Sequence, residues 1–234
     1  MTRNGRNRTI GYYNLDLLPD DCLTANGMPI IWPCKTIPPD DLIGFNYAKG
    51  TATKQATRLG CHFYLDDYQF ERCWQNPIKY GQMLSKFQCV LTPDFSLYRD
   101  MPLPMQRWNC YRSRLIGMVW QRMGLSVIPS AQWSSPDSYD FAFDGLPSHS
   151  VISVSSVGVL GDQEATRLWK HGFRVMEDLL SPSLILLYGK IPDGFKITTK
   201  HVQYTNHNTR RLKQWEAEAQ TAQGENQDQE AAQR

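Results

Sequence analysis

The sequence predicts an α/β protein with a mainly parallel sheet of five or six strands joined by βαβ units. Short apolar segments alternate with amphipathic helical segments between residues 59 and 190, a pattern typical of right-handed βαβ connections. The last apolar segment, SLILLYG at 183–189, has almost no polar residue, as expected of a strand buried on both faces. The chain has 234 residues, 41% of them hydrophobic, which is enough for one buried core.

Five segments have the apolar, β-branched or aromatic composition of strands. They are CHFYL at 61–65, FQCVLT at 87–92, LSVIPS at 125–130, SVISVSSVGV at 150–159 and SLILLYG at 183–189. A sixth strand is expected in FAFDG at 141–145. These strands are fewer than the eight of a complete TIM barrel, so an open sheet is favoured. The alternative is a compact or incomplete TIM-like barrel in which N-terminal residues supply extra strands.

Helical periodicity separates these strands. Residues 70–87 have apolar side chains at helical spacing, with Pro77 interrupting the helix. Residues 103–124 carry the longest apolar stripe in the chain and end at a glycine. Residues 165–180 form another amphipathic segment, which stops before a Ser-Pro pair.

Composition divides the chain into three parts. Residues 1–58 are rich in proline and predict an irregular N-terminal arm. Residues 59–204 hold the predicted α/β domain. Residues 205–234 are rich in Gln and Glu, with no large apolar residue after Trp215, and predict a disordered tail or a frayed, solvated helix. The formal charge of +2 is uneven, because residues 214–234 carry −4 and the remainder of the chain +6.

Several protein classes lose support. No apolar run approaches the roughly 18 residues of a membrane span, and no apolar segment follows the basic N-terminus, so we expect a cytoplasmic protein without a membrane partner. The six cysteines form no CxxC pair, which favours buried structural thiols over a zinc or redox site. The phosphate-binding glycine motifs of nucleotide enzymes are absent, and no histidine follows a predicted strand end.

Polar residues gather where the predicted strands end. In parallel α/β folds, ligands bind beyond the carboxyl ends of the strands. Asp66 and Asp67 follow the first predicted strand, Asp94 follows the second, and Asp144 ends the predicted extra strand. Carboxylates that converge from several strands can act as acid and base, or hold a divalent metal ion such as Mg²⁺ or Mn²⁺. The alternatives are an N-cap for Asp67, an Asx-turn for Asp94 and a tight turn for Asp144.

Four other residues near the strand ends are candidates for substrate binding. Ser96 and Arg99 lie in the polar loop after residue 92, and Arg112 and Arg114 lie in the helix that follows. A guanidinium there can clamp an anion, or pair with a carboxylate such as Asp94 as a structural staple.

Trp133 is the remaining candidate, because it follows the third predicted strand. An indole in that position can stack on a base or sugar, or it can simply close the core.

The order of sequence blocks resembles a family of uncharacterised proteins from bacteria, phages and mobile elements. The resemblance covers roughly residues 45–190. Its blocks are LDDYQFERCW at 65–74, LTPDFSLYRDMP at 91–102, NCYRSRLIGMVWQRMG at 109–124, the IP and W of 128–133, FAFDG at 141–145, SVSSVGV at 153–159 and LYG at 187–189. The resemblance implies a phage or mobile-element context and assigns no catalytic residue.

Two functions remain from different classes. The first is an enzyme with a carboxylate- and arginine-lined cleft that acts on a nucleotide or a nucleic-acid-related substrate. The second is a non-catalytic module that binds nucleic acid or a host protein through basic residues. Those residues are Arg3, Arg6, Arg8, Lys200, Arg210, Arg211 and Lys213.

Overall fold

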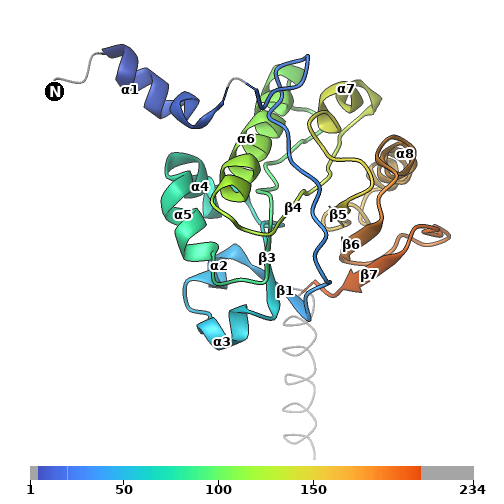
Figure 1. Ribbon diagram of the computed structural model, residues 1–234. Coiled ribbons are helices and arrows are strands. Elements are labelled where there is room, and N and C mark those ends of the chain that lie inside the picture. Colours follow the sequence, from blue (N-terminus) through green and yellow to red (C-terminus); the bar gives the residue numbers. More distant parts are fainter. Residues whose placement is uncertain (1–4, 20, 207–234) are drawn as a thin grey trace, which may run out of the picture.

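The strands of the computed structural model run parallel to their neighbours, in the order in which they occur along the chain (Figure 1). The structure describes residues 5–19 and 21–206. The first sheet contains β1 (Asp41–Gly44), β2 (Leu59–His62), β3 (Cys89–Leu91) and β4 (Val127–Ile128). The second sheet contains β5 (Val151–Ser155), β6 (Leu184–Tyr188) and β7 (His201–Tyr204).

A short parallel bridge between Ser130 and Ser153 connects the two sheets. The amide of Ala131 donates a hydrogen bond of 2.8 Å to the Ser153 carbonyl, and the amide of Ser153 donates one of 2.9 Å to the Pro129 carbonyl. The strand order is therefore continuous from β1 to β7. Each strand lies beside the strand that precedes it in the sequence.

Inward-facing side chains of β1 and of β3 to β7 form one buried cluster with Cys34 and with Tyr64, which follows β2. Its members are Cys34, Leu42, Tyr64, Cys89, Leu91, Ile128, Val151, Leu184, Leu186, Tyr188 and Tyr204. Side chains from β1 and β7, at opposite ends of the strand order, can share a cluster only if the sheet curls. No ladder joins β7 to β1 within the described residues, so the barrel does not close. The Tyr204 hydroxyl donates a hydrogen bond of 2.9 Å to the Pro39 carbonyl, close to the start of β1.

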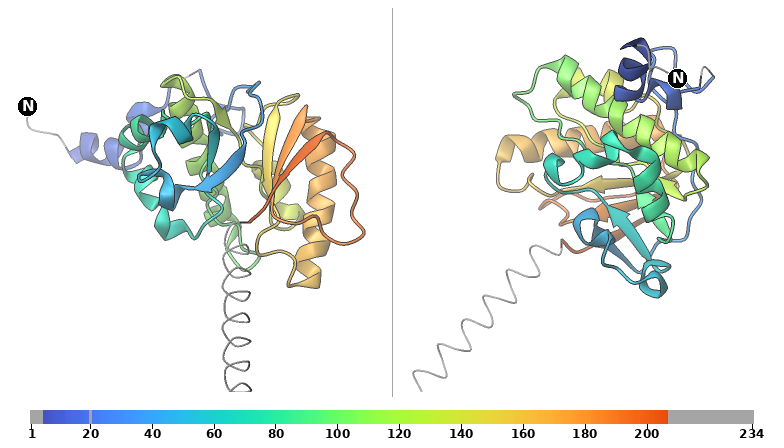
Figure 2. Two further views of the ribbon diagram at one scale, coloured as in Figure 1. Left: turned by 90° about the horizontal axis from the view of Figure 1, so that it is seen from below. Right: turned by 90° about the vertical axis from the view of Figure 1, so that its left-hand side faces the viewer.

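Two long helices cover the outer faces of the sheets. Helix α6 (Leu103–Arg122) packs Leu115, Ile116 and Trp120 against the outward side chains of β2 to β4. Helix α8 (Gln163–Leu180) covers β5 and β6 with Phe173 and its neighbours (Figure 2). Alternate residues of β5 and β6, for example, therefore face either the interior or helix α8, as the period of two requires.

Shorter helices complete the fold. Helices α4 (Glu71–Gln75) and α5 (Pro77–Leu84) lie between β2 and β3, and Pro77 begins α5 as the predicted interruption. The remaining helices are α1 (Gly5–Tyr12), α2 (Phe45–Ala48), α3 (Thr53–Ala56), α7 (Tyr139–Ala142) and the 3-10 helices η1 (Leu15–Leu17), η2 (Asp67–Gln69) and η3 (Pro136–Ser138). None of the described helices has both the length and the apolar composition needed to cross a membrane.

The predicted fold class is confirmed, and two expectations about elements are wrong. Residues 141–145 are not a strand, because Phe141 and Ala142 end helix α7 and the chain turns at Gly145, which has a φ of 74°. Residues 41–58 are not irregular, because they hold β1, α2 and α3. The N-terminal segment thus supplies a strand, as in the predicted barrel-like alternative. Most of the predicted tail, from residue 207, lies outside the described residues.

All six cysteines are buried and free, as the sequence predicts. Burial raises the pKa of the Cys61 and Cys89 thiols, which keeps them protonated. These thiols therefore serve as small apolar side chains in the core.

Candidate functional site

A cavity of about 540 Å³ lies at the carboxyl ends of β2, β3, β4 and β5. Its lining residues fall within 64–69 after β2, 94–99 after β3, 131–134 after β4 and 154–169 from β5 to the first turns of α8. This volume is in the range of pockets that hold small ligands. Of the predicted site residues, Asp66, Asp94, Ser96, Arg99 and Trp133 line the cavity, whereas Asp67, Asp144, Arg112 and Arg114 lie outside its lining.

Asp94 is the carboxyl group with the most unusual surroundings. It lies three residues after the end of β3, and its Oδ1 atom is buried without a hydrogen-bond partner. Burial, followed by the nearby charge of Asp67, raises the pKa of Asp94 to about 8, although Arg114 acts in the opposite direction. None of the ion pairs among the described residues includes Asp94. The group can therefore exchange a proton near neutral pH.

Arg114 is fully buried on the inner side of α6. Its Nη2 donates a hydrogen bond of 2.6 Å to the Ala142 carbonyl, and its Nε donates one of 3.3 Å to the Asp144 carbonyl. The Nη1 atom has no partner. Burial lowers the pKa of this guanidinium, but an arginine stays charged in proteins. Arg114 is thus a fixed positive charge within electrostatic reach of Asp94.

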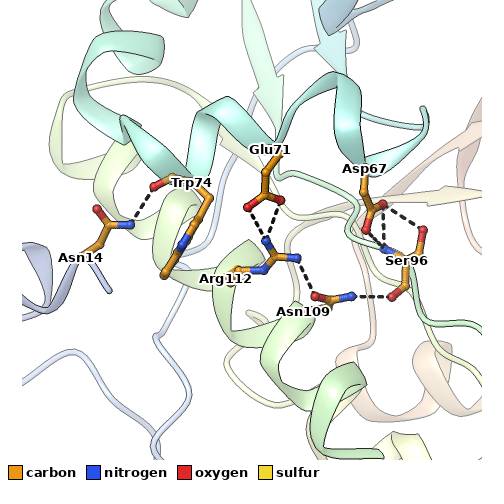
Figure 3. A network of polar contacts seen from close by, with 7 residues as sticks. All are labelled: Asn14, Asp67, Glu71, Trp74, Ser96, Asn109 and Arg112. Carbon is orange, nitrogen blue, oxygen red and sulfur yellow. Dashed lines mark hydrogen bonds and ion pairs between the residues drawn. The ribbon is translucent and has the colours of Figure 1, made fainter. Parts of the chain in front are cut away.

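The other predicted acid, Asp67, belongs to a polar network that shapes the loop after β3 (Figure 3). Both the amide and the hydroxyl of Ser96 donate hydrogen bonds to the Asp67 carboxylate, the latter over 2.9 Å. The Ser96 carbonyl accepts a hydrogen bond of 2.7 Å from the Asn109 side chain. Asp67 therefore holds the loop that carries Asp94 and does not enter the cavity.

Arg112 continues the same network. Its guanidinium pairs with Glu71 at 2.7 Å and bonds to the Asn109 side chain (Figure 3). It also lies 3.8 Å from the centre of the Phe95 ring. The partner suggested by the sequence, Asp94, is not the observed one. Arg112 therefore joins α6 to α4, and its contact with Phe95 supports the loop after β3.

Two charged side chains meet at the rim of the cavity. Arg99 forms an ion pair with Asp162, the N-cap of α8, whose carboxylate also accepts a hydrogen bond of 3.0 Å from the Ala165 amide. That amide, and then Arg99, lower the pKa of Asp162. The start of α8, where the helix dipole favours negative charge, is therefore occupied by the protein's own carboxylate. Asp66 is exposed on the opposite segment and accepts a hydrogen bond from Gln69.

Trp133 forms a wall of the cavity together with Trp169. The indole lies against Gly172 of α8, where an added Cβ atom would come within 2.2 Å of the Trp133 Nε1 atom. Glycine is costly inside a helix, by roughly 0.5–1 kcal/mol relative to alanine. Gly172 is therefore required by the position of Trp133.

We expect Gly172→Ala to destabilise the protein by about 1–2 kcal/mol, because overpacking against the indole outweighs the gain in helix propensity. The displaced indole should also change the tryptophan fluorescence. Gly11→Ala in α1 is the matched control, since nothing lies within 4 Å of its added Cβ atom. Equal melting temperatures for Gly172→Ala and wild type would contradict this account of Trp133.

Asp144 lies away from the cavity. Its carboxylate accepts hydrogen bonds from Thr24 at 2.9 Å and Asn26 at 3.2 Å, which fasten the N-terminal segment near its bridge between Leu23 and Pro29. This arrangement agrees with the structural alternative of a turn residue. The predicted strand at 141–145, which would have brought Asp144 to the sheet edge, does not exist.

Sequence reasoning missed several residues of the cavity. Tyr64, Gln132, Ser134 and Trp169 all line it, and the Ser134 Oγ atom is buried without a hydrogen-bond partner. Tyr64 Oη lies 2.6 Å from the Ser153 hydroxyl, in the interior of the sheet. Tyr64 could have been found from the sequence, because it lies two residues after His62 in CHFYL and therefore faces the same side of the sheet.

Metal binding finds no support in the side-chain arrangement. Among the residues that the structure describes, no three His, Cys, Asp or Glu side chains form a group that could hold a metal ion. The sequence placed His62 at a strand start, but it is the last residue of β2, and its Nδ1 accepts a hydrogen bond of 3.1 Å from the Tyr64 amide.

Comparison with known proteins identifies phage relatives. A family model described as “Domain of unknown function (DUF4417)” matches residues 21–205. The “Gene 1 protein” of Mycobacterium phage L5 is 43% identical over 130 residues, which cover 56% of this chain and 57% of that protein. The “Gene 1 protein” of Mycobacterium phage D29 is 37% identical over 156 residues, which cover 67% of this chain and 58% of that protein.

The chain thus spans less than two thirds of the length of these two relatives. No solved structure matches it. The resemblance to an uncharacterised family with phage members is confirmed.

Proposed function

We propose that this chain, which belongs to the family described as “Domain of unknown function (DUF4417)”, is an enzyme that transfers protons at a nucleoside or nucleotide base. The base would lie in the cavity at the carboxyl ends of β2 to β5. Asp94 is the acid–base group in this proposal, and Trp133 and Ser96 position the substrate or the loop that holds it.

The buried Asp94 carboxyl carries the proposal. A general acid or base works best when its pKa is close to the operating pH, and the pKa of Asp94 is about 8. An unpaired carboxyl group with a raised pKa in the lining of a cavity is a feature of active sites, because structural carboxylates are normally paired or hydrogen-bonded. Burial, followed by the charge of Asp67, raises the pKa of Asp94 and favours the protonated form, whereas Arg114 lowers this pKa.

The lining supports a ring-shaped substrate. Trp133 supplies a partly exposed aromatic surface and Leu97 further apolar area, and the largely buried rings of Tyr64 and Trp169 also border the cavity. Bases stack on such aromatic side chains whatever their sequence.

A thermal-shift titration tests the proposal. Wild type, Asp94→Asn and the rim control Asp66→Asn would be titrated with Mg²⁺, Mn²⁺, nucleosides, nucleotides and short oligonucleotides. Each variant is compared with its own ligand-free melting temperature, because Asp94→Asn changes stability by itself. We expect a nucleoside or nucleotide to stabilise wild type and Asp66→Asn but not Asp94→Asn. If no ligand discriminates between the two variants, Asp94 is not part of a binding site and the proposal fails.

A nucleic-acid-binding module is the second candidate, favoured by helix α1. Arg6 and Arg8 are exposed on this helix, which extends away from the sheets (Figure 1). Next to them, Tyr12 is 74% exposed and Tyr13 contacts Trp108 with ring centres 6.0 Å apart. Exposed aromatic rings among arginines suit single-stranded nucleic acid. Oligonucleotide binding that persists in Asp94→Asn and weakens steeply with salt would favour this candidate.

The other basic residues predicted for a nucleic-acid-binding module add little support from the structure. Lys200 lies immediately before β7 and is exposed. Arg3, Arg210, Arg211 and Lys213 lie outside the described residues.

A further inference from the structure

Helices α2 to α5 and the loops that join them carry basic side chains with almost no acid among them. Residues 42–65 contain α2, α3 and β2, and residues 72–93 contain most of α4, all of α5 and β3. These two segments together hold six arginine or lysine residues and neither Asp nor Glu. We call the six residues the basic face; they are Lys49, Lys54, Arg58, Arg72, Lys79 and Lys86.

Contacts between the helices bring the two segments together. Phe45 of α2 packs against Tyr80 of α5, with ring centres 5.7 Å apart, and the Arg72 guanidinium of α4 lies 5.8 Å from the centre of the Phe45 ring. Lys86, just after α5, donates a hydrogen bond of 2.6 Å to the Thr51 carbonyl, between α2 and α3. The four helices therefore lie on one side of the molecule, and their basic side chains belong to one surface (Figures 1 and 2).

Most of the charges on the basic face are not neutralised by the protein itself. Five of the six side chains are exposed, and Lys86 is partly buried. Among the ion pairs of the described residues, the basic face contributes only Arg58, which pairs with Asp40.

The opposite side of the molecule has the opposite charge. Residues 134–180, which contain α7 and α8, carry seven Asp or Glu residues and three Arg or Lys residues. Helix α8 lies across the sheets from α2 to α5 (Figure 1). The charge is therefore polarised across the fold, so a negatively charged polymer would be directed to the side of the basic face.

The composition of the surface distinguishes among negatively charged partners. Proteins that bind single strands rely on aromatic rings on which successive bases stack, and in the two segments of the basic face Tyr47, at 45%, is the one ring that is exposed. Helices that bind at a membrane surface bury an apolar stripe in the lipid, whereas Ile78, at 40%, is the one large aliphatic side chain exposed in these segments. Spaced charges without stacking rings or an apolar stripe suit the phosphates of a duplex, which carries one negative charge per roughly 1.7 Å.

We infer that the basic face binds the phosphate backbone of a nucleic-acid duplex without regard to its sequence. This surface is separate from the cavity and from helix α1, so the inference goes beyond the proposed function and does not depend on Asp94. Each phosphate contact lowers the slope of log K against log salt by about 0.9. Five basic side chains without an ion pair therefore predict a slope no steeper than about −4.5.

Fluorescence anisotropy with a labelled DNA duplex of mixed sequence, repeated at several NaCl concentrations, tests the inference. The test variant combines Lys54→Gln in α3 with Lys79→Gln in α5, because both side chains are exposed and neither forms an ion pair. The control combines Lys190→Gln with Lys196→Gln, two exposed lysines between β6 and β7. Each double variant removes the same net charge.

We expect the test variant to lose roughly tenfold in affinity at low salt and to reduce the magnitude of the salt slope by about 2. The control should bind the duplex like wild type, and so should Asp94→Asn. Equal melting temperatures of the two double variants would show that the loss of binding does not come from unfolding.

Several results would overturn the inference. Equal losses in the test and control variants would mean that net charge alone attracts the duplex. A loss confined to Arg6→Gln with Arg8→Gln would assign the binding to helix α1. Tighter binding of the matching single strand, or of vesicles that contain phosphatidylserine, would assign the basic face to a different partner. Failure of wild type to bind the duplex at low salt would also contradict it, whatever the nucleoside titrations show for the cavity.

Discussion

Replacing Arg114 with methionine is expected to lower the free energy of unfolding by about 3 kcal/mol, because the change leaves buried backbone carbonyls without donors. Arg114 is fully buried, and its guanidinium donates to the carbonyls of Ala142 and Asp144. These two carbonyls lie in the turn between α7 and Gly145, and the Gly145 carbonyl in turn accepts a hydrogen bond of 2.9 Å from Ile31. Methionine fills a similar volume but donates no hydrogen bond.

Equilibrium unfolding in urea measures this effect, with Arg107→Met as the control. Arg107 lies two turns earlier on α6, and its ion pair with Asp140 joins side chains that are 48% and 63% exposed. An exposed pair of this kind contributes less than about 1 kcal/mol. If Arg114→Met unfolds at the wild-type urea concentration, the cost of burying the guanidinium cancels its hydrogen bonds, and the residue has no net structural role.

Asp94→Asn is expected to act in the opposite direction and to raise the free energy of unfolding by roughly 4 kcal/mol at pH 7 to 8, since each unit of pKa shift corresponds to about 1.4 kcal/mol. The pKa of Asp94 is about 8 in the folded protein and about 3.9 in an unfolded chain. Between these values the folded state holds one more proton than the unfolded state. The wild type therefore loses stability, relative to a neutral side chain, as the pH rises from about 4 to about 8.

The pH profile distinguishes this account from a general effect of the substitution. Below about pH 4 the carboxyl group is protonated in both states, so the difference between Asp94→Asn and wild type should shrink toward zero. Above about pH 8 the difference should stay constant. Thermal unfolding between pH 4 and pH 9 measures it, and Asp66→Asn, at an exposed rim position, should follow wild type within about 0.5 kcal/mol.

A destabilised Asp94→Asn at pH 8 would mean that the ionised carboxylate supports the fold, for example by offsetting the charge of Arg114. A stabilised variant would fit a residue kept for function at the expense of stability. The same experiment on Arg114→Met should place the Asp94 transition at higher pH, because Arg114 lowers the pKa of Asp94.

The sequence predicted the long elements well. The helices expected at 103–124 and 165–180 are α6 and α8, to within two residues at each end, because their apolar stripes span four to six turns. It missed β1 and β7, which have four residues each. Segments this short show too few alternations of polar and apolar residues to be recognised. Strand β1 was not recognised because the residues before it are rich in proline. The segment FAFDG has the composition of a strand, but its first residues form the helical hydrogen bonds of α7.

The candidate site was predicted in part. The rule that ligands bind at the carboxyl ends of parallel strands placed Asp66, Asp94, Ser96, Arg99 and Trp133 around one cavity. The partners of the charged residues could not be predicted, since they depend on contacts between distant segments. Arg112 and Glu71 are 41 residues apart, and Arg99 and Asp162 are 63 apart. These pairings remove the free arginines that a phosphate clamp would need.

The N-terminal segment and the strand order together affect the way in which this protein folds during synthesis. Sheet neighbours are neighbours in sequence, so most of the sheet can assemble as the chain emerges, with loops of low closure entropy. The segment before β1 is different, because Trp32 bonds to Gln121 over 89 residues and Cys34 bonds to Ser150 over 116 residues. This segment is therefore translated early but docks late. Until residue 150 has left the ribosome, Cys34 lacks its partner, so this early stretch stays undocked for longer than the first strands of the sheet.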